Sequence, residues 1–469
     1  MKVKIVNCWT SRYRRKDQHL VPSLTLAHLA ALAPDWCKVT LHHEQVQPVD
    51  VEQDVADGVQ LAALSFPTGF ALHAYRLADE YRHHGIPVVM GGPHVTFLPD
   101  EASSHADAVV VGEAELVWGQ VLADFKRGHV QRIYRTDQIH SLAGLPMPRY
   151  DLIEPAFAVP HVVQATRGCP YRCKFCVTAT LNPGFRTRPL EEVIRDIATP
   201  RFSDWLQNKL VWFWDDNLTA NRRYIKALLR EMIPLNKWWL TQASLDLTDD
   251  DELLKLMHDS GCVGVFLGIE TLDVDALKSV SKNHNKVARY KQAIHKLHDC
   301  GITVMAGLII GFDTDTATSV DSLLDQVREL EIDAPFLSVL TPYYGTQLYD
   351  EMLQSGRILL DRDWTYYSGY AVSFRPAEMK VEELEAAHSR LWRALHAPGT
   401  TLTRWLRGWG TLRPGALILS TALSGHYGLN RLTGNVPVRF READSPTEPL
   451  PARTYFGFRI ADFGLRSAT

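Results

Sequence analysis

The first quarter of the chain alternates short apolar runs with stretches whose apolar residues recur every three or four positions. The short runs predict four buried strands: residues 3–8, 58–65, 87–90 and 108–112. The periodic stretches predict helices at residues 23–32 and 71–84. Strands that alternate with helices are typical of a doubly wound parallel sheet, which binds ligands at the carboxyl ends of its strands.

A second alternating series follows residues 137–151, a stretch with two prolines that we interpret as a linker. Its first strand is expected at residues 162–168, and a helix opens at Pro189 with acidic residues in its first turn. Five more strands are predicted: residues 210–214, 239–243, 263–268, 303–310 and 336–340. Six strands separated by helices, such as residues 287–299, predict a partial (β/α)6 barrel with its functional residues at the strand ends.

Beyond residue 350 the pattern becomes mainly helical. Residues 381–425 are rich in Trp and Leu, with Trp405 and Trp409 among them. We interpret this stretch as a packed helical cap, and the alternative is an apolar substrate channel or a helix on a membrane surface. Residues 441–469 are expected to form an irregular arm. The predicted α/β chain therefore has three domains: residues 1–140, 155–350 and 351–469.

Composition and charge narrow the class of protein. The 469 residues are 46% hydrophobic and 22% charged, which is ordinary for soluble globular domains. The net charge of -4 and the lack of a long basic run argue against a nucleic-acid partner. The seven cysteines do not suggest a disulfide framework, so we expect a reducing cytoplasm. We see neither a signal peptide nor the run of about 18 apolar residues that a membrane span needs.

Three of the cysteines, Cys169, Cys173 and Cys176, lie close together. Thiolates hold iron–sulfur clusters, and a cubane cluster normally has four protein ligands, so three would leave one iron open. A structural zinc site would need a fourth Cys or His nearby, but the next histidine downstream is His258. Buried structural cysteines are the other alternative. The spacing favours an iron–sulfur cluster with an open iron.

These cysteines lie in Arg-Gly-Cys-Pro-Tyr-Arg-Cys-Lys-Phe-Cys, residues 167–176, which resembles the signature of the radical S-adenosylmethionine (SAM) superfamily. The resemblance covers residues 155–350. It implies a [4Fe-4S] cluster on the three cysteines and a SAM molecule that chelates the open iron. It also implies that an electron, delivered by a flavodoxin or ferredoxin type donor, cleaves SAM to a 5′-deoxyadenosyl radical.

The resemblance extends to the loops that follow the predicted barrel strands. It implies SAM contacts at eight residues: Tyr171, Phe175, Asp215, Asp216, Gln242, Ser244, Glu270 and Gly311. For the two aspartates the alternative role is a helix cap, and for the two aromatic residues it is core packing. Arg186 and Arg188 would pair either with surface acids or with the SAM carboxylate. The sequence assigns no catalytic residue.

The N-terminal loops resemble those of the cobalamin-binding domain that precedes many radical SAM barrels, with typical Gly-Gly-Pro-His and Gly-Glu segments. The resemblance implies cobalamin contacts at nine residues: Ser65, Phe66, Gly91, Gly92, Pro93, His94, Val95, Gly112 and Glu113. The alternative is a degenerate domain that keeps the fold and binds no cofactor. Because Pro22 replaces the glycine of an Asp-x-His-x-x-Gly motif, we do not expect His19 to coordinate cobalt.

Residues 356–379 resemble an extension found in cobalamin-type radical SAM proteins that include hopanoid C2 methylases. The resemblance implies methylation of an unactivated carbon of a small-molecule or lipid-like natural product, with peripheral membrane contact as one way to reach a lipid. One alternative is a radical rearrangement, cyclisation or carbon–carbon coupling. Another is a SAM- or cobalamin-sensing protein without turnover, against which the intact cysteine motif argues.

Two cofactor domains on one chain serve each other only if both face one substrate. We therefore expect the loops at Gly92 and Cys173 to open toward a shared space, lined also by residues 311–313 and 343–345. Within the second of these loops, Tyr344 stands where relatives have the second proline of Pro-x-Pro-Gly-Thr-x-Leu-Tyr. This exchange is expected to alter a loop on the substrate side.

Overall fold

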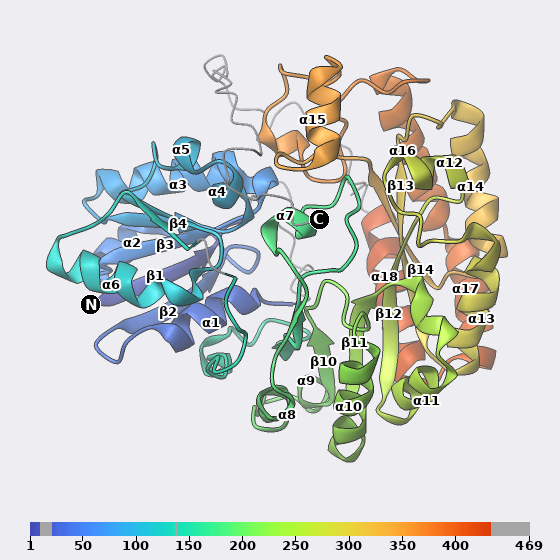
Figure 1. Cartoon of the computed structure of the whole chain (residues 1–469), viewed down its shortest axis with the longest axis horizontal. Helices are drawn as coiled ribbons and strands as arrows, with labels where there is room; N and C mark the ends of the chain where they lie inside the picture. The colour runs from blue at the N-terminus through green and yellow to red at the C-terminus, as the bar shows by residue number, and fades with distance from the viewer. Residues whose placement is uncertain (10–20, 137–138, 433–469) are drawn as a thin grey trace, which may run out of the picture.

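The computed structural model describes residues 1–9, 21–136 and 139–432, which form two parallel sheets that stand apart in Figure 1. The N-terminal sheet has the order β2-β1-β3-β4-β5-β6. Its strands are β1 Lys2–Asn7, β2 Lys38–His43, β3 Leu61–Ser65, β4 Val88–Gly91, β5 Ala108–Val111 and β6 Ile133–Arg135. The four predicted strands are confirmed. The edge strands β2 and β6 were missed because both are partly exposed and carry few apolar residues.

Helices cover both faces of this sheet, as a doubly wound fold requires. α1 and α6 pack on the face that carries Ile5, Ala63 and Val110, and α3 packs on the face that carries Leu64 and Met90. Successive strand residues point to opposite faces, so strands buried on both sides are apolar throughout. The helices are α1 Leu24–Leu32, α2 Val51–Ala56, α3 Ala71–His83, α4 Pro93–Phe97, α5 Pro99–Ala102 and α6 Trp118–Arg127.

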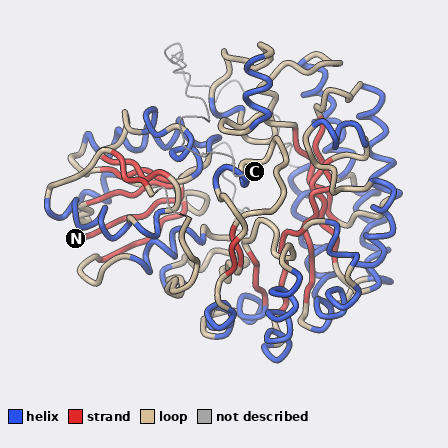
Figure 2. Tube along the Cα trace, viewed as in Figure 1, coloured by secondary structure: helices blue, strands red, loops and turns tan. Residues whose placement is uncertain are grey.

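The second sheet is a curved row of parallel strands in the order β14-β13-β12-β11-β10-β7. Helices line its convex side (Figure 2) and bury outward-facing residues such as Val265 and Val304. The strands are β7 Val162–Val163, β10 Leu210–Phe213, β11 Trp238–Ala243, β12 Cys262–Glu270, β13 Thr303–Ile310 and β14 Ala334–Val339. The main helices are α8 Leu190–Ala198, α10 Arg222–Met232, α11 Asp251–Asp259, α13 Tyr290–Asp299 and α14 Ala317–Glu329. The predicted partial barrel is confirmed.

The barrel also carries shorter elements near its edges. These are β8 Thr166–Arg167, β9 Arg186–Thr187, α7 Thr178–Leu181, α9 Trp205–Lys209 and α12 Val274–Ser279. β8 and β9 form a separate antiparallel pair. This hairpin begins just after β7 and carries the three-cysteine motif between its two strands.

The first predicted barrel strand, residues 162–168, is therefore split, and the prediction of one continuous strand was wrong. Only β7 joins the sheet, and β8 turns away from it. At this break, the backbone N–H groups of Ala165 and of Thr166, the first residue of β8, donate to the carboxylate of Asp215 instead of to a neighbouring strand. Apolar spacing cannot reveal where a carboxylate from a distant loop replaces the hydrogen bonds of a sheet.

The C-terminal helices surround the barrel and also fill part of it. α18 lies on the concave face, where Leu419 and Leu423 meet Leu240 and Met305. At this contact a Cβ atom on Gly264 would come within 2.5 Å of Leu419, so a larger residue there would push the leucine side chain away. These helices are α15 Gln347–Gln354, α16 Val381–Leu395, α17 Pro398–Thr411 and α18 Pro414–Leu432. The arm expected at residues 441–469 lies outside the described residues.

α17 leaves an apolar stripe on the surface. Gly408 is buried toward α18, whereas Leu402, Leu406 and Trp409 are each more than half exposed. The cap therefore combines a packed face of α18 with a stripe of α17 that presents apolar side chains to solvent. In the described part of the chain, every helix is too short or too polar to cross a bilayer.

A segment between α15 and α16 joins the barrel to the N-terminal sheet. The indole N–H of Trp364 donates to Glu101 at 2.7 Å, and its ring lies 5.4 Å from that of His94. At the barrel, the Val339 N–H donates to the Gly369 carbonyl at 2.7 Å. The two sheets are thus connected through a third piece of chain as well as through the linker.

Candidate active site

The cysteine loop begins where β8 ends. Gly168 opens it with a φ of 89°, and a side chain there would overlap the Gly184 carbonyl, so only glycine fits. The three cysteines are free thiols. Burial, together with the neighbouring thiols of Cys176 and Cys169, raises the pKa of Cys173 to about 11. Three thiols that influence one another within one loop fit the ligand set of a cluster.

Two aspartates after β10 hold this loop in place. Asp215 is buried and accepts from the Thr166 hydroxyl at 2.7 Å and from the Ala165 N–H at 3.2 Å. Burial raises the pKa of Asp215 to about 7. Asp216 accepts from the Gly168 N–H at 2.9 Å. Asp215 thus binds the residues that lead into the loop and Asp216 binds the loop itself, and their role as SAM contacts stays a prediction.

Asn217 belongs to the same strand end and was not included among the predicted site residues. Its amide N–H donates to the Ser244 hydroxyl at 2.5 Å and lies 3.8 Å from the Cys169 sulfur. The Ser244 N–H donates back to the Asn217 carbonyl oxygen at 3.3 Å. The polar triplet Asp-Asp-Asn at a strand end was the signal that could have identified it. An N–H donor beside a cysteine sulfur tunes the potential of a cluster.

Glu270, at the end of β12, turns back over the concave face of the barrel. Its φ of 65° is uncommon for a residue other than glycine, and Gly268 leaves the space that its carboxylate occupies. Lys282 forms an ion pair with it at 2.8 Å, and the two side chains are 11% and 10% exposed. Burial alone would lower the pKa of Lys282. The interactions with Glu270 and with the Cys173 thiol outweigh burial, so the pKa is raised above its usual value. No pattern in the sequence pointed to Lys282.

Tyr171 and Phe175 flank the cysteine loop. Tyr171 stacks on His284 with ring centroids 3.6 Å apart, and its hydroxyl donates to Asp246 at 3.3 Å. Phe175 packs partly against the core, and the Lys282 ammonium lies 5.9 Å from its ring centroid. Burial lowers the pKa of His284 to about 4, so its ring is neutral near pH 7. His284 was also missed, since it lies in the same irregular segment as Lys282.

The concave face of the barrel is accessible at the carboxyl ends of the strands. Near the carboxyl ends of β12 and β13, the residues that point into the barrel are half-buried. The residues between them, which point outward, are buried. Half-buried inward positions are taken by Gln242 in β11, Trp212 in β10 and Phe336 in β14. Just beyond β13, Gly311 has a φ of 102°, and Leu384 of α16 leaves it no room for a side chain. A SAM contact at Gly311 stays a prediction.

The three N-terminal loops meet at one edge of their sheet. Gly92 has a φ of 101°, and a side chain there would come within 3.1 Å of both Ser65 and the Phe66 backbone. The N–H of Gly112 donates to the Thr96 hydroxyl at 3.1 Å, which joins the third loop. Glycine backbone along such an edge suits the close approach of a large ligand.

Several of the side chains that were predicted to contact cobalamin do not lie along this edge. Phe66, His94 and Val95 are buried in the interior, with at most 1% of each exposed. Glu113 faces the barrel and is engaged in ion pairs. Cobalamin contacts at these positions stay predictions, and only backbone groups of the buried residues are placed to make them. His19 lies outside the described residues.

Loops at the carboxyl ends of the two sheets meet, and α7 lies between the sheets in Figure 1. Gly345, in the loop after β14, lies so close to the Phe97 ring of α4 that a Cβ atom would overlap it. The Thr180 hydroxyl of α7 donates to the Gly345 carbonyl at 3.1 Å. By contrast, Asp313 is more than half exposed and pairs with Arg357. The arrangement supports a shared space between the cysteine loop and the N-terminal edge.

Two family models match the chain: the radical SAM superfamily over residues 163–327 and the B12 binding domain over residues 13–122. The bacteriochlorophyllide d C-12(1)-methyltransferase of Chlorobaculum tepidum is 30% identical over 394 residues, which are 82% of this chain and 84% of the relative. The chain belongs to the cobalamin-dependent radical SAM methyltransferase family. The predicted family is confirmed, and with it the prediction that the protein is an enzyme.

Two further comparisons agree with this family. The hopanoid C-2 methylase of Rhodopseudomonas palustris is 28% identical over 357 residues, 73% of this chain and 66% of the relative. The radical SAM methyltransferase TsrM from Kitasatospora setae superposes with a TM-score of 0.67 at 14% identity, over 92% of this chain and 99% of that one. At this identity the likeness shows a common fold: a cobalamin-type sheet, a radical SAM barrel and further C-terminal structure.

Enzymes of this family use a [4Fe-4S] cluster, SAM and cobalamin. The residues present fit these groups. Three free thiols gather in one loop, and the glycine edge at Gly92 leaves its backbone open to a large ligand. The cofactor predictions are therefore confirmed at the level of the family.

One prediction concerns the cobalt of cobalamin, which we expect to carry no protein imidazole. His94, the histidine of the Gly-Gly-Pro-His segment, is fully buried, and its Nε2 lies 2.8 Å from a tyrosine hydroxyl. The electron paramagnetic resonance (EPR) spectrum of the cob(II)alamin form should therefore be unchanged when all histidines carry nitrogen-15. A change of nitrogen splitting on labelling, lost again in His19→Ala, would contradict this expectation.

Proposed function

We propose that this enzyme transfers a methyl group to an unactivated carbon of a large apolar small molecule. The observation that carries the proposal is the concave face of the barrel, where Trp212, Phe266 and Phe336 pack partly against the cluster that includes Leu423 of α18 but remain half-buried. An apolar substrate would cover these side chains, and burial of apolar surface contributes about 25 cal/mol per Å². The two relatives act on bacteriochlorophyllide d and on hopanoids, which are both large and apolar.

When bound, the cluster, SAM and cobalamin supply the radical and the methyl group. The chain supplies ligands, orientation and charge. Cys169, Cys173 and Cys176 would hold the cluster, while Asp215 keeps their loop in its position. Lys282, held by Glu270, would offer its ammonium group to the SAM carboxylate, because a buried cation can bind an anion strongly.

We also propose that a donor of flavodoxin or ferredoxin type reduces the cluster in a reducing cytoplasm. All seven cysteines are free thiols, which suits such a compartment. The stacked rings of Tyr171 and His284 are half-buried beside the cysteine loop. They would shield the cluster on the side from which an external donor approaches.

The products of SAM test this function. With bacteriochlorophyllide d or a hopanoid as the trial substrate, a reductant and SAM, a methyltransferase should release S-adenosylhomocysteine and 5′-deoxyadenosine in roughly equal amounts, one from each role of SAM. Mass spectrometry of the substrate should show an added methyl group, and deuterated SAM should pass its label to that group.

A different outcome would point to another radical reaction. Substrate-dependent 5′-deoxyadenosine without S-adenosylhomocysteine and without an added methyl group would favour rearrangement, cyclisation or coupling. A parallel reaction without cobalamin is the control, since it should lose both S-adenosylhomocysteine and the methylated product.

A further inference from the structure

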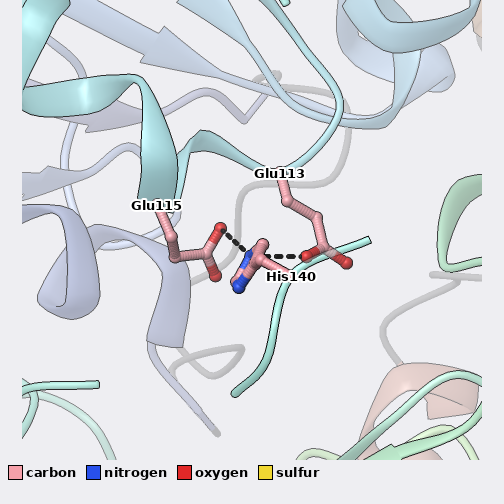
Figure 3. A group of neighbouring side chains, drawn as sticks. All are labelled: Glu113, Glu115 and His140. Atoms are coloured by element: carbon pink, nitrogen blue, oxygen red, sulfur yellow. Dashed lines mark ion pairs between the residues drawn. The ribbon is translucent and has the colours of Figure 1, made fainter. Parts of the chain in front are cut away.

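A dense group of ionisable side chains lies between the two sheets. Figure 3 shows His140, from the linker, between the carboxylates of Glu113 and Glu115, which both follow β5. The Nε2 atom of His140 is 2.7 Å from Glu113 and 3.7 Å from Glu115. None of these three side chains is more than 15% exposed. The N-terminal sheet therefore presents two shielded carboxylates toward the barrel.

Two arginines of the cysteine hairpin complete this group. Arg167, the second residue before Cys169, lies 3.1 Å from Glu113 and 2.6 Å from Glu115 through its two terminal nitrogens. Arg186 stands opposite Arg167 in the β8–β9 pair and donates to both oxygens of Glu113, to one of them at 2.9 Å. Glu113 thus contacts both strands of the hairpin that delivers the cysteines.

Two carboxylates and an imidazole at this distance could in principle hold a metal ion. Here, however, guanidinium groups already contact three of the four carboxylate oxygens, and the positive charges of the two arginines balance the negative charges of the two glutamates. Burial alone would raise the pKa of Glu115, but His140 and Arg167 hold it well below its usual range. The group is an ion-pair network that joins two domains.

We propose that this network, Glu113, Glu115, His140, Arg167 and Arg186, is a lock that positions the cysteine loop relative to the cobalamin edge. β5, which the two glutamates follow, lies next to β4, which ends at the Gly-Gly loop of that edge. On the other side, one glycine separates Arg167 from the first cysteine. The lock therefore links the two cofactor sites over a short stretch of protein.

The lock matters for the reaction because the radical and the methyl group must reach the same carbon. Paired guanidinium and carboxylate groups give directional, charge-assisted hydrogen bonds, and those of Arg186 to Glu113 are bidentate. Removal of one partner leaves a shielded charge unpaired, which destabilises the arrangement. The inference rests on the proposed function only in the part of the test that measures reaction products.

The test uses the anaerobically reconstituted holoenzyme with Glu113→Gln, Arg186→Gln, the double variant and Arg186→Lys. Asp151→Asn is the matched control, since Asp151 pairs with Arg149 at 2.7 Å in the same connecting region but is 61% exposed. The first readout needs no substrate: pulsed EPR measures the dipolar interaction between cob(II)alamin and the reduced cluster. Iron and cobalamin contents are determined on the same samples.

The wild type and Asp151→Asn should give one narrow distance between the two centres. Glu113→Gln and Arg186→Gln should keep iron and cobalamin but lose that single distance. With a substrate that the wild type methylates, methyl transfer per 5′-deoxyadenosine should fall about 10- to 100-fold, because small misplacements of reacting groups have effects of this size. The double variant should be no worse than the worse single one, and Arg186→Lys should recover part of the loss.

Unchanged distances in both Gln variants would overturn the lock. Loss of iron that Arg186→Lys does not reverse would overturn it as well, because these residues would then maintain the fold of the hairpin and not its placement. If the wild type forms no methylated product, the proposed function fails. The distance measurement would still decide whether the network positions the cysteine loop.

Discussion

Alanine at Cys169, Cys173 and Cys176 together is expected to remove the iron and abolish SAM cleavage. No other described cysteine lies in this loop to replace a lost ligand. A cluster left with no thiolate has nothing to hold it. Iron and sulfide analysis after anaerobic reconstitution, with 5′-deoxyadenosine measured on the same samples, tests this expectation.

Cys300→Ser is the matched control for that experiment. Cys300 is partly buried at the end of α13, far along the chain from the cysteine loop. Its replacement should leave the iron content at the wild-type level. If instead the triple variant retained full iron, the assignment of the three cysteines as cluster ligands would be refuted.

Lys282→Ala is expected to have the second largest effect, a loss of SAM affinity of about 100-fold. A hydrogen bond between charged groups contributes about 1.5–3 kcal/mol, and each 1.4 kcal/mol corresponds to about a tenfold change in affinity. The substitution also leaves the Glu270 carboxylate without its partner at 2.8 Å. Equilibrium binding of SAM to the reconstituted protein, measured together with the iron content, tests the prediction.

Lys278→Ala is the matched control, because Lys278 forms an ion pair with Asp275 at 2.9 Å but both side chains are more than 60% exposed. Exposed pairs contribute about 0–1 kcal/mol, so SAM binding should not change. Lys282→Arg, which keeps the charge, should recover part of the affinity. If Lys282→Ala bound SAM with wild-type affinity, the ammonium group would not be a SAM contact.

Most of the fold could be predicted from the sequence because most strands of both sheets are buried and rich in apolar residues. β3, β5 and β13 are examples in which burial on both faces leaves a clear signal. The split between β7 and β8 could not be predicted in this way. It depends on Asp215, whose carboxylate comes from a loop 50 residues away from the Ala165 N–H that it binds.

The candidate site shows the same division between local and distant information. The cysteines could be identified because their spacing along the chain is itself the signal. Lys282 could not, since its importance depends on Glu270 and on the cysteine loop, which only the fold brings to it. The same holds for Glu113, predicted as a cobalamin contact, whose ion pairs with Arg167 and Arg186 bridge two domains.

The position of α18 has a consequence for the synthesis of the protein on the ribosome. Leu419 and Leu423 cover the concave face of strands that are made long before them. From the end of β14 to the end of α18 the ribosome needs roughly 5–20 s at about 5–20 residues per second. During this time the nascent barrel lacks its inner cover, while the cysteine loop has already been made.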